Sequence, residues 1–155
     1  ADRLMPTHLY DKAPPYLIKG GLIFQELSQP YLQAFGKEWS SRAPLNLLDV
    51  YNNPEAHAEE GRRRVVMITR VIPTDATIGY ERIASQIVKS VNGQPVAGLA
   101  ELAKALDQTP TNGLHEIDTD DSPYRIYLDE NLADQVDQQF KASGLPSLSR
   151  IDRAE

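Results

Sequence analysis

The chain has 155 residues, of which 41% are hydrophobic and 25% charged, a size and composition that suit one domain with its own core and exclude disorder throughout. A formal net charge of −6 argues against a nucleic-acid partner, which requires clustered Lys and Arg. The absence of cysteine excludes disulfide scaffolds and thiolate metal sites, and no apolar stretch is long enough to span a bilayer.

The first residues predict an extended lead-in followed by a strand pair. Residues 1–15 are polar and proline-bearing and are expected to be this lead-in. Tyr16–Ile18 and Leu22–Phe24 are apolar runs on either side of Gly20–Gly21. This pattern is typical of two strands joined by a tight turn or a bulge.

A helical insertion is expected after the strand pair. Ser28 suits an N-cap, Pro30 a first turn and Gly36 a C′ position, so a short helix is predicted between Ser28 and Gly36. Residues 37–64 are expected to be a loop-rich insertion with a second short helix at Leu45–Tyr51.

Two features of the insertion need interpretation. Trp39 has several apolar residues near it in the sequence, which form either a satellite core, our first interpretation, or an exposed patch for a partner. Arg62–Arg64 is a basic run that follows Glu59 and Glu60. We interpret it as a solvated loop with balanced charge.

The middle of the chain has the strongest strand signals. Val65–Ile68 and Val71–Ile72 predict a strand that ends at Pro73, and Ile87–Val91 predicts another. Asn92–Gly93 comes directly after the second strand and is typical of a two-residue hairpin turn.

A helix, a hairpin and a second helix are predicted for the last third. Apolar residues recur at helical spacing within residues 98–108, which indicates an amphipathic helix. Leu114–Ile117 and Tyr124–Leu128 predict a hairpin, and residues 130–142 predict a C-terminal helix. Short strands with one central helix and peripheral helices indicate an α+β architecture.

Several segments resemble PDZ domains of the HtrA/Deg family of serine proteases. Gln25–Leu32 resembles the strand-then-helix entry of these domains. Val65–Val71, a V-x-x-V-N-G-x-x-V hairpin over Val88–Val96 and the helix that begins at Leu99 follow one another in the order of the circularly permuted, bacterial-type PDZ domain. Gly21–Phe24 and further short matches over residues 8–150 resemble the distal PDZ domain of plant-type Deg proteases and their bacterial relatives.

This resemblance implies the fold and the domain organisation. The expected fold is an α+β, circularly permuted, PDZ-like and partly open β-barrel or sandwich with a groove helix. A single domain is expected over residues 16–150. Residues 37–64 are expected to be its inserted helical loop and residues 130–142 its extra C-terminal helix.

The resemblance also implies a peptide groove. A PDZ domain adds an extended peptide to a strand edge beside a helix, and backbone N–H groups of a glycine-bearing loop hold its terminal carboxylate. By resemblance the pairing strand is Leu22–Leu27 and the groove helix is Leu99–Leu106. The predicted peptide-binding residues are Lys19, Gly20, Gly21, Leu22, Ile23, Phe24, Gln25 and Ala103.

The predicted loop departs from the family pattern. Lys19 and Gly20 stand where HtrA-type domains usually have an aromatic and an apolar residue, so an apolar wall is lost and a cation that can pair with a carboxylate is gained. The alternative is that Gly20–Gly21 is only a bulge that admits a strand to the sheet. The apolar stripe of the groove helix is interpreted as core, with Ala103 at the edge of the groove.

Neither a catalytic site nor a metal or cofactor site is predicted. The sequence contains no Gly-Asn-Ser-Gly-Gly or comparable nucleophile motif. His8, His57 and His115 have no partners at ligand spacing and are expected in loops or on the surface. The acidic residues within 118–121 lack the glycine and the distal Glu of a calcium loop and are expected to form a solvated turn.

Three functions are compared. The resemblance implies a non-catalytic interaction module of a Do-like serine protease, acting in protein quality control, which binds peptide segments or neighbouring subunits by strand addition. The alternative is a structural oligomerisation domain with an occluded groove, and an independent hydrolase is the third possibility. The first two differ in whether the edge of Leu22–Leu27 is open, or covered by residues 37–64 or by the C-terminal helix. The resemblance favours the bacterial periplasm over the cytoplasm.

Overall fold

The computed structural model describes residues 5–6, 15–58, 62–121, 124–144 and 148–150 of the chain. The expected lead-in over residues 1–15 therefore lies almost entirely outside the described residues. Among the described residues, no helix is both long and apolar enough to cross a membrane.

One antiparallel sheet runs through the molecule. Its strand order is β7-β6-β4-β3-β2-β1-β8, and β5 pairs with β4 beside this path. Because β7 and β8 stand at the two ends of the order, the sheet is not closed. The strands are β1 (Tyr16–Lys19), β2 (Leu22–Glu26), β3 (Val66–Val71), β4 (Gln86–Val91), β5 (Gln94–Pro95), β6 (Leu114–Thr119), β7 (Arg125–Asp129) and β8 (Ser149–Arg150).

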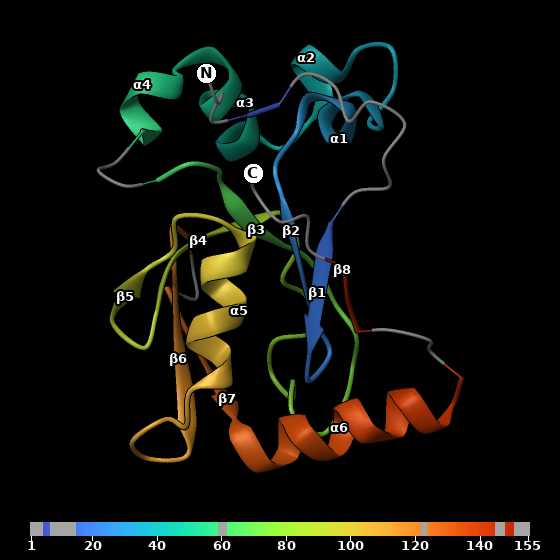
Figure 1. Ribbon diagram of the computed structural model, residues 1–155. Helices are drawn as coiled ribbons and strands as arrows, with labels where there is room; N and C mark the ends of the chain where they lie inside the picture. Colours follow the sequence, from blue (N-terminus) through green and yellow to red (C-terminus); the bar gives the residue numbers. More distant parts are fainter. Residues whose placement is uncertain (1–4, 7–14, 59–61, 122–123, 145–147, 151–155) are drawn as a thin grey trace.

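Helices lie at both ends and in front of this sheet. In Figure 1, α1 to α4 gather at one end, α6 lies across the opposite end, and α5 stands between them. The helices are α1 (Gln29–Gln33), α2 (Trp39–Arg42), α3 (Leu45–Asn52), α4 (Pro54–His57), α5 (Leu99–Asp107) and α6 (Glu130–Ala142). The α+β, PDZ-like fold class is confirmed, and helices are present where residues 98–108 and 130–142 predicted them, at α5 and α6.

The main core joins the sheet to α5 and α6. Leu22 and Phe24, which alternate along β2, are fully buried in it. The apolar stripe of α5 packs in the same core, so its interpretation as core is confirmed. Burial of each such side chain stabilises the fold by roughly 1.5–3 kcal/mol.

A second core lies under the helices of the insertion. Because β3 buries both faces, Val66 and Ile68 belong to the main core whereas Met67 belongs to the second one. Trp39 packs against the second core, and its ring meets that of Tyr51 at 5.0 Å between centroids. The satellite-core interpretation of Trp39 is therefore confirmed.

The insertion is more ordered than the sequence indicated. The short helices α2 and α4 were not predicted, because an element of four residues is too short to show helical periodicity. The basic run is not a solvated loop. Arg62 donates a hydrogen bond to the carbonyl oxygen of His57 at 3.0 Å, and Arg63 Nη2 lies 2.6 Å from Glu101 Oε1, so the run is held against α4 and α5.

The end of β2 fixes the start of α5. The N-cap residue of α5 is Gly98, which has no side chain to accept a hydrogen bond. The carboxylate of Glu26 takes that place, with Oε2 accepting from the backbone N–H of Leu99 at 2.9 Å. A carboxylate at a helix N-terminus is also favoured by the helix dipole, so this contact ties the predicted groove helix to the predicted pairing strand.

The predicted hairpin turn at Asn92–Gly93 is confirmed. Asn92 has φ 52° and Gly93 has φ 80°, as a type I′ turn between β4 and β5 requires. An added Cβ at Gly93 would meet no atom within 4 Å, so only backbone strain opposes a side chain there.

Replacing Gly93 by valine tests this turn. Gly93→Val is expected to lower the free energy of unfolding by more than about 1 kcal/mol, because a β-branched residue is strained at positive φ. Gly93→Asn is the matched control, since asparagine tolerates this conformation and should cost less. Urea unfolding of the three proteins measures the difference, and equal midpoints for valine and asparagine would contradict the assignment.

Candidate functional site

Both edges of the predicted pairing strand β2 are occupied within the chain. β1 pairs with one edge, from Lys19 opposite Leu22 to Tyr16 opposite Gln25. β3 pairs with the other edge, beginning with Leu22 opposite Val71. From the sequence, this strand was expected to have an edge that is open, or covered by residues 37–64 or by the C-terminal helix. In the structure, β1 and β3 cover the two edges of β2 instead.

The outer edge of β1 carries a further short strand. β8 places Arg150 opposite Tyr16 and Ser149 opposite Leu17. The backbone N–H of Ile18 donates to the carbonyl oxygen of Leu148 at 2.7 Å. An extended backbone is thus already added to β1, and α5 lies next to both β1 and β2.

The predicted binding residues on β2 and α5 have different exposures. Leu22 and Phe24 are fully buried in the main core, so their side chains stabilise the fold and do not reach a ligand surface. Ile23 and Gln25 alternate with them and are half-buried. Ala103 is half-buried at the edge of the apolar stripe of α5, as the sequence indicated.

Lys19 is already paired with carboxylates of α6. Its Nζ lies 3.3 Å from Glu130 Oε1 and 3.5 Å from Asp134 Oδ1. Burial acts against the charged form, but the neighbouring carboxylates outweigh it, so the pKa of Lys19 is raised. The cation expected to pair with a ligand is thus neutralised by the chain itself.

The glycine pair forms the tight turn between β1 and β2 and packs against its surroundings. The backbone N–H of Gly20 donates to Asp137 Oδ1 at 2.9 Å, and a Cβ at Gly20 would lie 3.0 Å from Ala133 Cβ. A Cβ at Gly21 would lie 2.7 Å from the carbonyl oxygen of Ile72. Contacts within the chain therefore account for the need for glycine at both positions.

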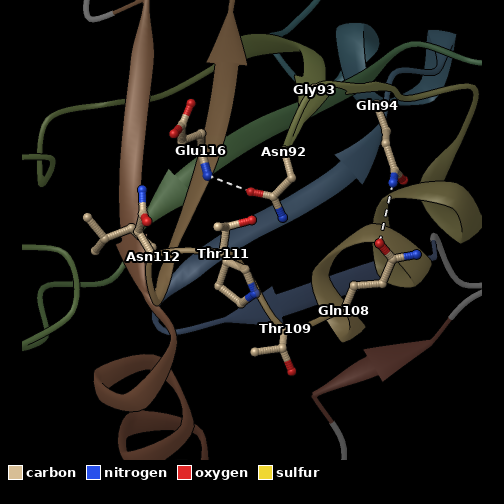
Figure 2. A pocket seen from close by; sticks show the side chains of 10 residues that line it. Asn92, Gly93, Gln94, Gln108, Thr109, Thr111, Asn112 and Glu116 are labelled. Atoms are coloured by element: carbon tan, nitrogen blue, oxygen red, sulfur yellow. Dashed lines mark hydrogen bonds between the residues drawn. The ribbon is translucent and has the colours of Figure 1, made fainter.

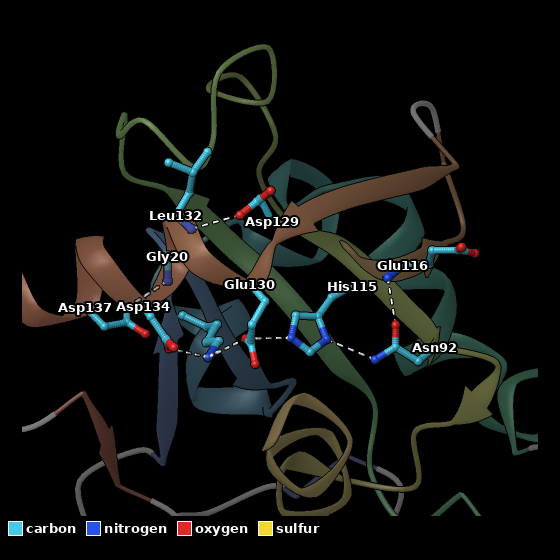
Figure 3. A network of polar contacts seen from close by, with 10 residues as sticks. Gly20, Asn92, His115, Glu116, Asp129, Glu130, Leu132, Asp134 and Asp137 are labelled. Carbon is cyan, nitrogen blue, oxygen red and sulfur yellow. Dashed lines mark hydrogen bonds and ion pairs between the residues drawn. The ribbon is translucent and has the colours of Figure 1, made fainter. Parts of the chain in front are cut away.

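A series of polar contacts leads from Lys19, beside the Gly20–Gly21 turn, through Glu130 to the buried His115 and on to Asn92. Asn92 Oδ1 accepts from the backbone N–H of Glu116 at 2.8 Å, so its Nδ2 is the donor to His115 Nδ1 at 3.0 Å. His115 Nε2 then carries the proton and donates to Glu130 Oε1 at 2.9 Å. Figure 3 shows this series from Asn92 through His115 to Glu130, with Asp134 and Asp137 beyond it. These contacts fix the tautomer of a neutral His115.

The expectation that His115 lies on the surface or in a loop is wrong. Its side chain is fully buried in β6, because it shares a face of the strand with Ile117 and Ile117 points into the core. Alternation along the predicted strand was the signal that could have placed it. Its partners could not be found from sequence, since Asn92 and Glu130 belong to other elements. The side chain of His57 is only partly buried, and its Nε2 lies 2.6 Å from Asp49 Oδ2. His8 lies outside the described residues.

Glu130 is the centre of these polar contacts. Burial raises the pKa of its carboxyl, but the hydrogen bond from His115 and the charge of Lys19 outweigh burial, so the pKa is lowered. Asp137 behaves in the opposite way: burial outweighs the hydrogen bond from Gly20 and raises its pKa. The ionised form of Glu130 is therefore stabilised by folding.

A polar pocket lies apart from all the predicted binding residues. It has a volume of about 360 Å³ and lies where the Asn92–Gly93 turn faces the residues that follow α5 (Figure 2). Neutral amides and hydroxyls dominate its lining, and Gln94 and Gln108 are hydrogen-bonded across it at 3.3 Å. Within the described part of the chain, His, Asp and Glu side chains form no group suited to a metal ion.

Comparisons with known proteins identify relatives of this chain. The family model described as "PDZ domain" matches residues 5–142. The chain is 30% identical over 106 residues to protease Do-like 2, chloroplastic, and 31% identical over 108 residues to putative protease Do-like 3, mitochondrial, both from Arabidopsis thaliana. It is 27% identical over 126 residues to the serine protease DegP homolog of Plasmodium falciparum.

The matches cover most of this chain and a small part of each relative. They span 67%, 70% and 81% of the chain, but 16%, 17% and 13% of the three relatives. The PDZ match covers most of the chain, and no catalytic domain is indicated in it. The names of the two plant relatives specify chloroplast and mitochondrion, so the expected bacterial periplasm gains no support from them.

Replacing Glu130 by glutamine tests the polar chain. Because folding lowers the pKa of Glu130, its ionised form stabilises the fold at neutral pH, and this stabilisation is lost as the pH falls through the lowered pKa. Glu130→Gln should therefore lower the free energy of unfolding by about 1 kcal/mol at neutral pH. The difference in the free energy of unfolding between Glu130→Gln and the native chain should disappear in acid. Denaturation across pH measures it, and Glu55→Gln, at an exposed position on α4, controls for net charge. A difference that stays constant into acid would contradict this role.

Proposed function

The chain belongs to the PDZ domain family, and on that basis we propose that it is a non-catalytic interaction module of a Do-like serine protease. It binds peptide segments or neighbouring subunits by strand addition and so regulates or assembles the protease. The PDZ match supports protein interaction as its class of function, and the Do-like relatives support the kind of protein in which it acts.

The observation that carries this proposal is the strand added to the outer edge of β1. Ile18 offers its N–H there and receives the carbonyl oxygen of Leu148. Among the described residues β8 has two, and each backbone hydrogen bond contributes about 1 kcal/mol net. A partner segment that pairs along all of β1 would make more such bonds and would compete with β8.

The strand to which a partner is added in this proposal is β1, whereas the sequence predicted β2. Addition to β2 itself would require release of β1, whose four residues are all paired with β2. Addition to β1 leaves this hairpin intact. The predicted binding residues remain proposals, with Lys19–Gly21 at one end of the edge and Ala103 as a wall on α5.

A structural oligomerisation domain with an occluded groove is the second candidate. It is favoured by the internal pairing of both edges of β2 and by the engagement of Lys19 with α6. The two candidates differ in one measurable property, the binding of free peptides, which only the first function requires.

Substitution of Ile18 and Arg150 tests strand addition. A peptide library is titrated against the chain by heat or amide shifts, with micromolar affinity expected, roughly −8 kcal/mol. Ile18→Pro should abolish binding because it removes the outward N–H, whereas the matched Ile18→Val keeps it. Arg150→Pro should tighten binding by weakening β8, because Arg150 lies opposite Tyr16 at the hydrogen-bonded position two residues from Leu148.

The outcomes separate the two functions. Loss of binding in Ile18→Pro with retention in Ile18→Val supports strand addition at β1. If neither the native chain nor Arg150→Pro binds any peptide, the interaction module is refuted and the oligomerisation domain takes its place.

A further inference from the structure

We infer that Tyr80 is a specificity-determining residue, because its hydroxyl covers the outer edge of β7 and so confines strand addition to the β1 side of the sheet. This inference rests on the proposed function and adds which side of the open sheet accepts a partner. It follows from the direction of the backbone groups of β7, from their contact with Tyr80 and from the packing that holds Tyr80 in place.

The outer edge of β7 is the second edge of the open sheet. Unpaired N–H and C=O groups at the edge of a sheet can pair with another chain. β8 ends the sheet on the β1 side, and β7 ends it on the other side. Among the described residues, no strand pairs with β7 on the side away from β6. A partner segment could therefore add to β7 as well as to β1, unless something covers the edge of β7.

Alternate residues of β7 direct their backbone groups away from β6. Two hydrogen bonds at the ends of this pairing set the alternation: Thr119 N–H donates to the carbonyl oxygen of Tyr124, and Glu130 N–H to that of Gly113, both at 2.9 Å. The even-numbered residues of β7 therefore bond to β6. The outward-facing backbone groups belong to Arg125, Tyr127 and Asp129.

The central outward donor of this edge is covered by Tyr80. The backbone N–H of Tyr127 donates to Tyr80 Oη at 3.2 Å. An added strand would need this N–H, because each outward-facing residue of an edge strand exchanges hydrogen bonds with its partner. The next outward residue, Asp129, is the N-cap of α6, and its Oδ1 accepts from the backbone N–H of Leu132 at 2.9 Å. The strand thus ends there, and pairing is left only around Arg125.

Tyr80 is held over the edge by its ring and by its backbone. The half-buried ring packs against the main core. The N–H of Tyr80 donates to the carbonyl oxygen of Thr77 at 2.9 Å, and Thr77 Oγ1 donates to that of Ile72 at 2.8 Å. Thr74 Oγ1 donates to the carbonyl oxygen of Gly20 at 2.7 Å, which ties the same segment to the β1–β2 turn. Removal of the hydroxyl alone should therefore leave the ring and this segment in place.

Replacing Tyr80 by phenylalanine tests the cover. The peptide library is titrated against the native chain and Tyr80→Phe while the amide resonances are followed. In the native chain, saturable shifts are expected at Ile18 and not along β7. In Tyr80→Phe, a second set of saturable shifts is expected at Arg125 and Tyr127. Without peptide, the amide hydrogen of Tyr127 should exchange about fivefold faster in Tyr80→Phe, the factor that corresponds to one hydrogen bond.

Two further proteins show whether the gained binding belongs to the edge of β7. Tyr124→Phe is the matched control and should behave as the native chain, because this exposed tyrosine directs its backbone toward β6. Tyr80→Phe combined with Tyr127→Pro removes the N–H that Tyr80→Phe uncovers, so the shifts at Arg125 should disappear while those at Ile18 remain. A merely structural role of Tyr80 would change stability and would produce neither result.

The results distinguish this inference from the proposed function. Saturable shifts at Arg125 and Tyr127 in the native chain, or no second set in Tyr80→Phe, would overturn the inference while shifts at Ile18 still uphold addition to β1. If no peptide shifts Ile18 but Tyr80→Phe gains binding at β7, Tyr80 does cover this edge and the proposed function is refuted. Should Tyr80→Phe fail to fold, Tyr80→Met, which also keeps an apolar side chain without a hydroxyl, is tested in the same way.

Discussion

The candidate site depends on the pairing of β1 with β2. All four residues of β1 lie opposite residues of β2, and the two-residue turn between them fixes the register. This pairing fills one edge of β2 and brings Lys19 and Gly20 to α6, while β8 pairs with the outer edge of β1. In the proposed function, strand addition therefore takes place one strand further out, in competition with β8.

Buried polar contacts hold α6 against the ends of the strands. A buried donor or acceptor without a partner costs free energy, and here each group satisfies the next, from Asn92 through His115 to Glu130 and Lys19. Among the described residues, no buried side-chain nitrogen or oxygen lacks a partner. Together with the apolar face of α6, this network makes the helix a structural element of the main core.

Local patterns in the sequence predicted much of the fold. Turn chemistry located the Asn92–Gly93 hairpin, and the apolar stripe located α5 and its buried face. The short helices α2 and α4 carry too few residues for a pattern and were missed. His115 was misplaced because it was considered as an isolated histidine, whereas the alternation of its strand puts it in the core.

The sequence by itself determined the family and the two strands around Gly20–Gly21. Only the tertiary structure decided how those residues are used. Lys19 and Gly20 meet Asp134 and Asp137 across separations of 115 and 117 residues, and no local pattern specifies contacts of that range. The edge of β2 is open or closed according to which strand pairs with it, and hydrophobic alternation is the same in both cases. For this reason the sequence could predict a glycine-bearing turn, and only the packed molecule showed that its residues contact α6.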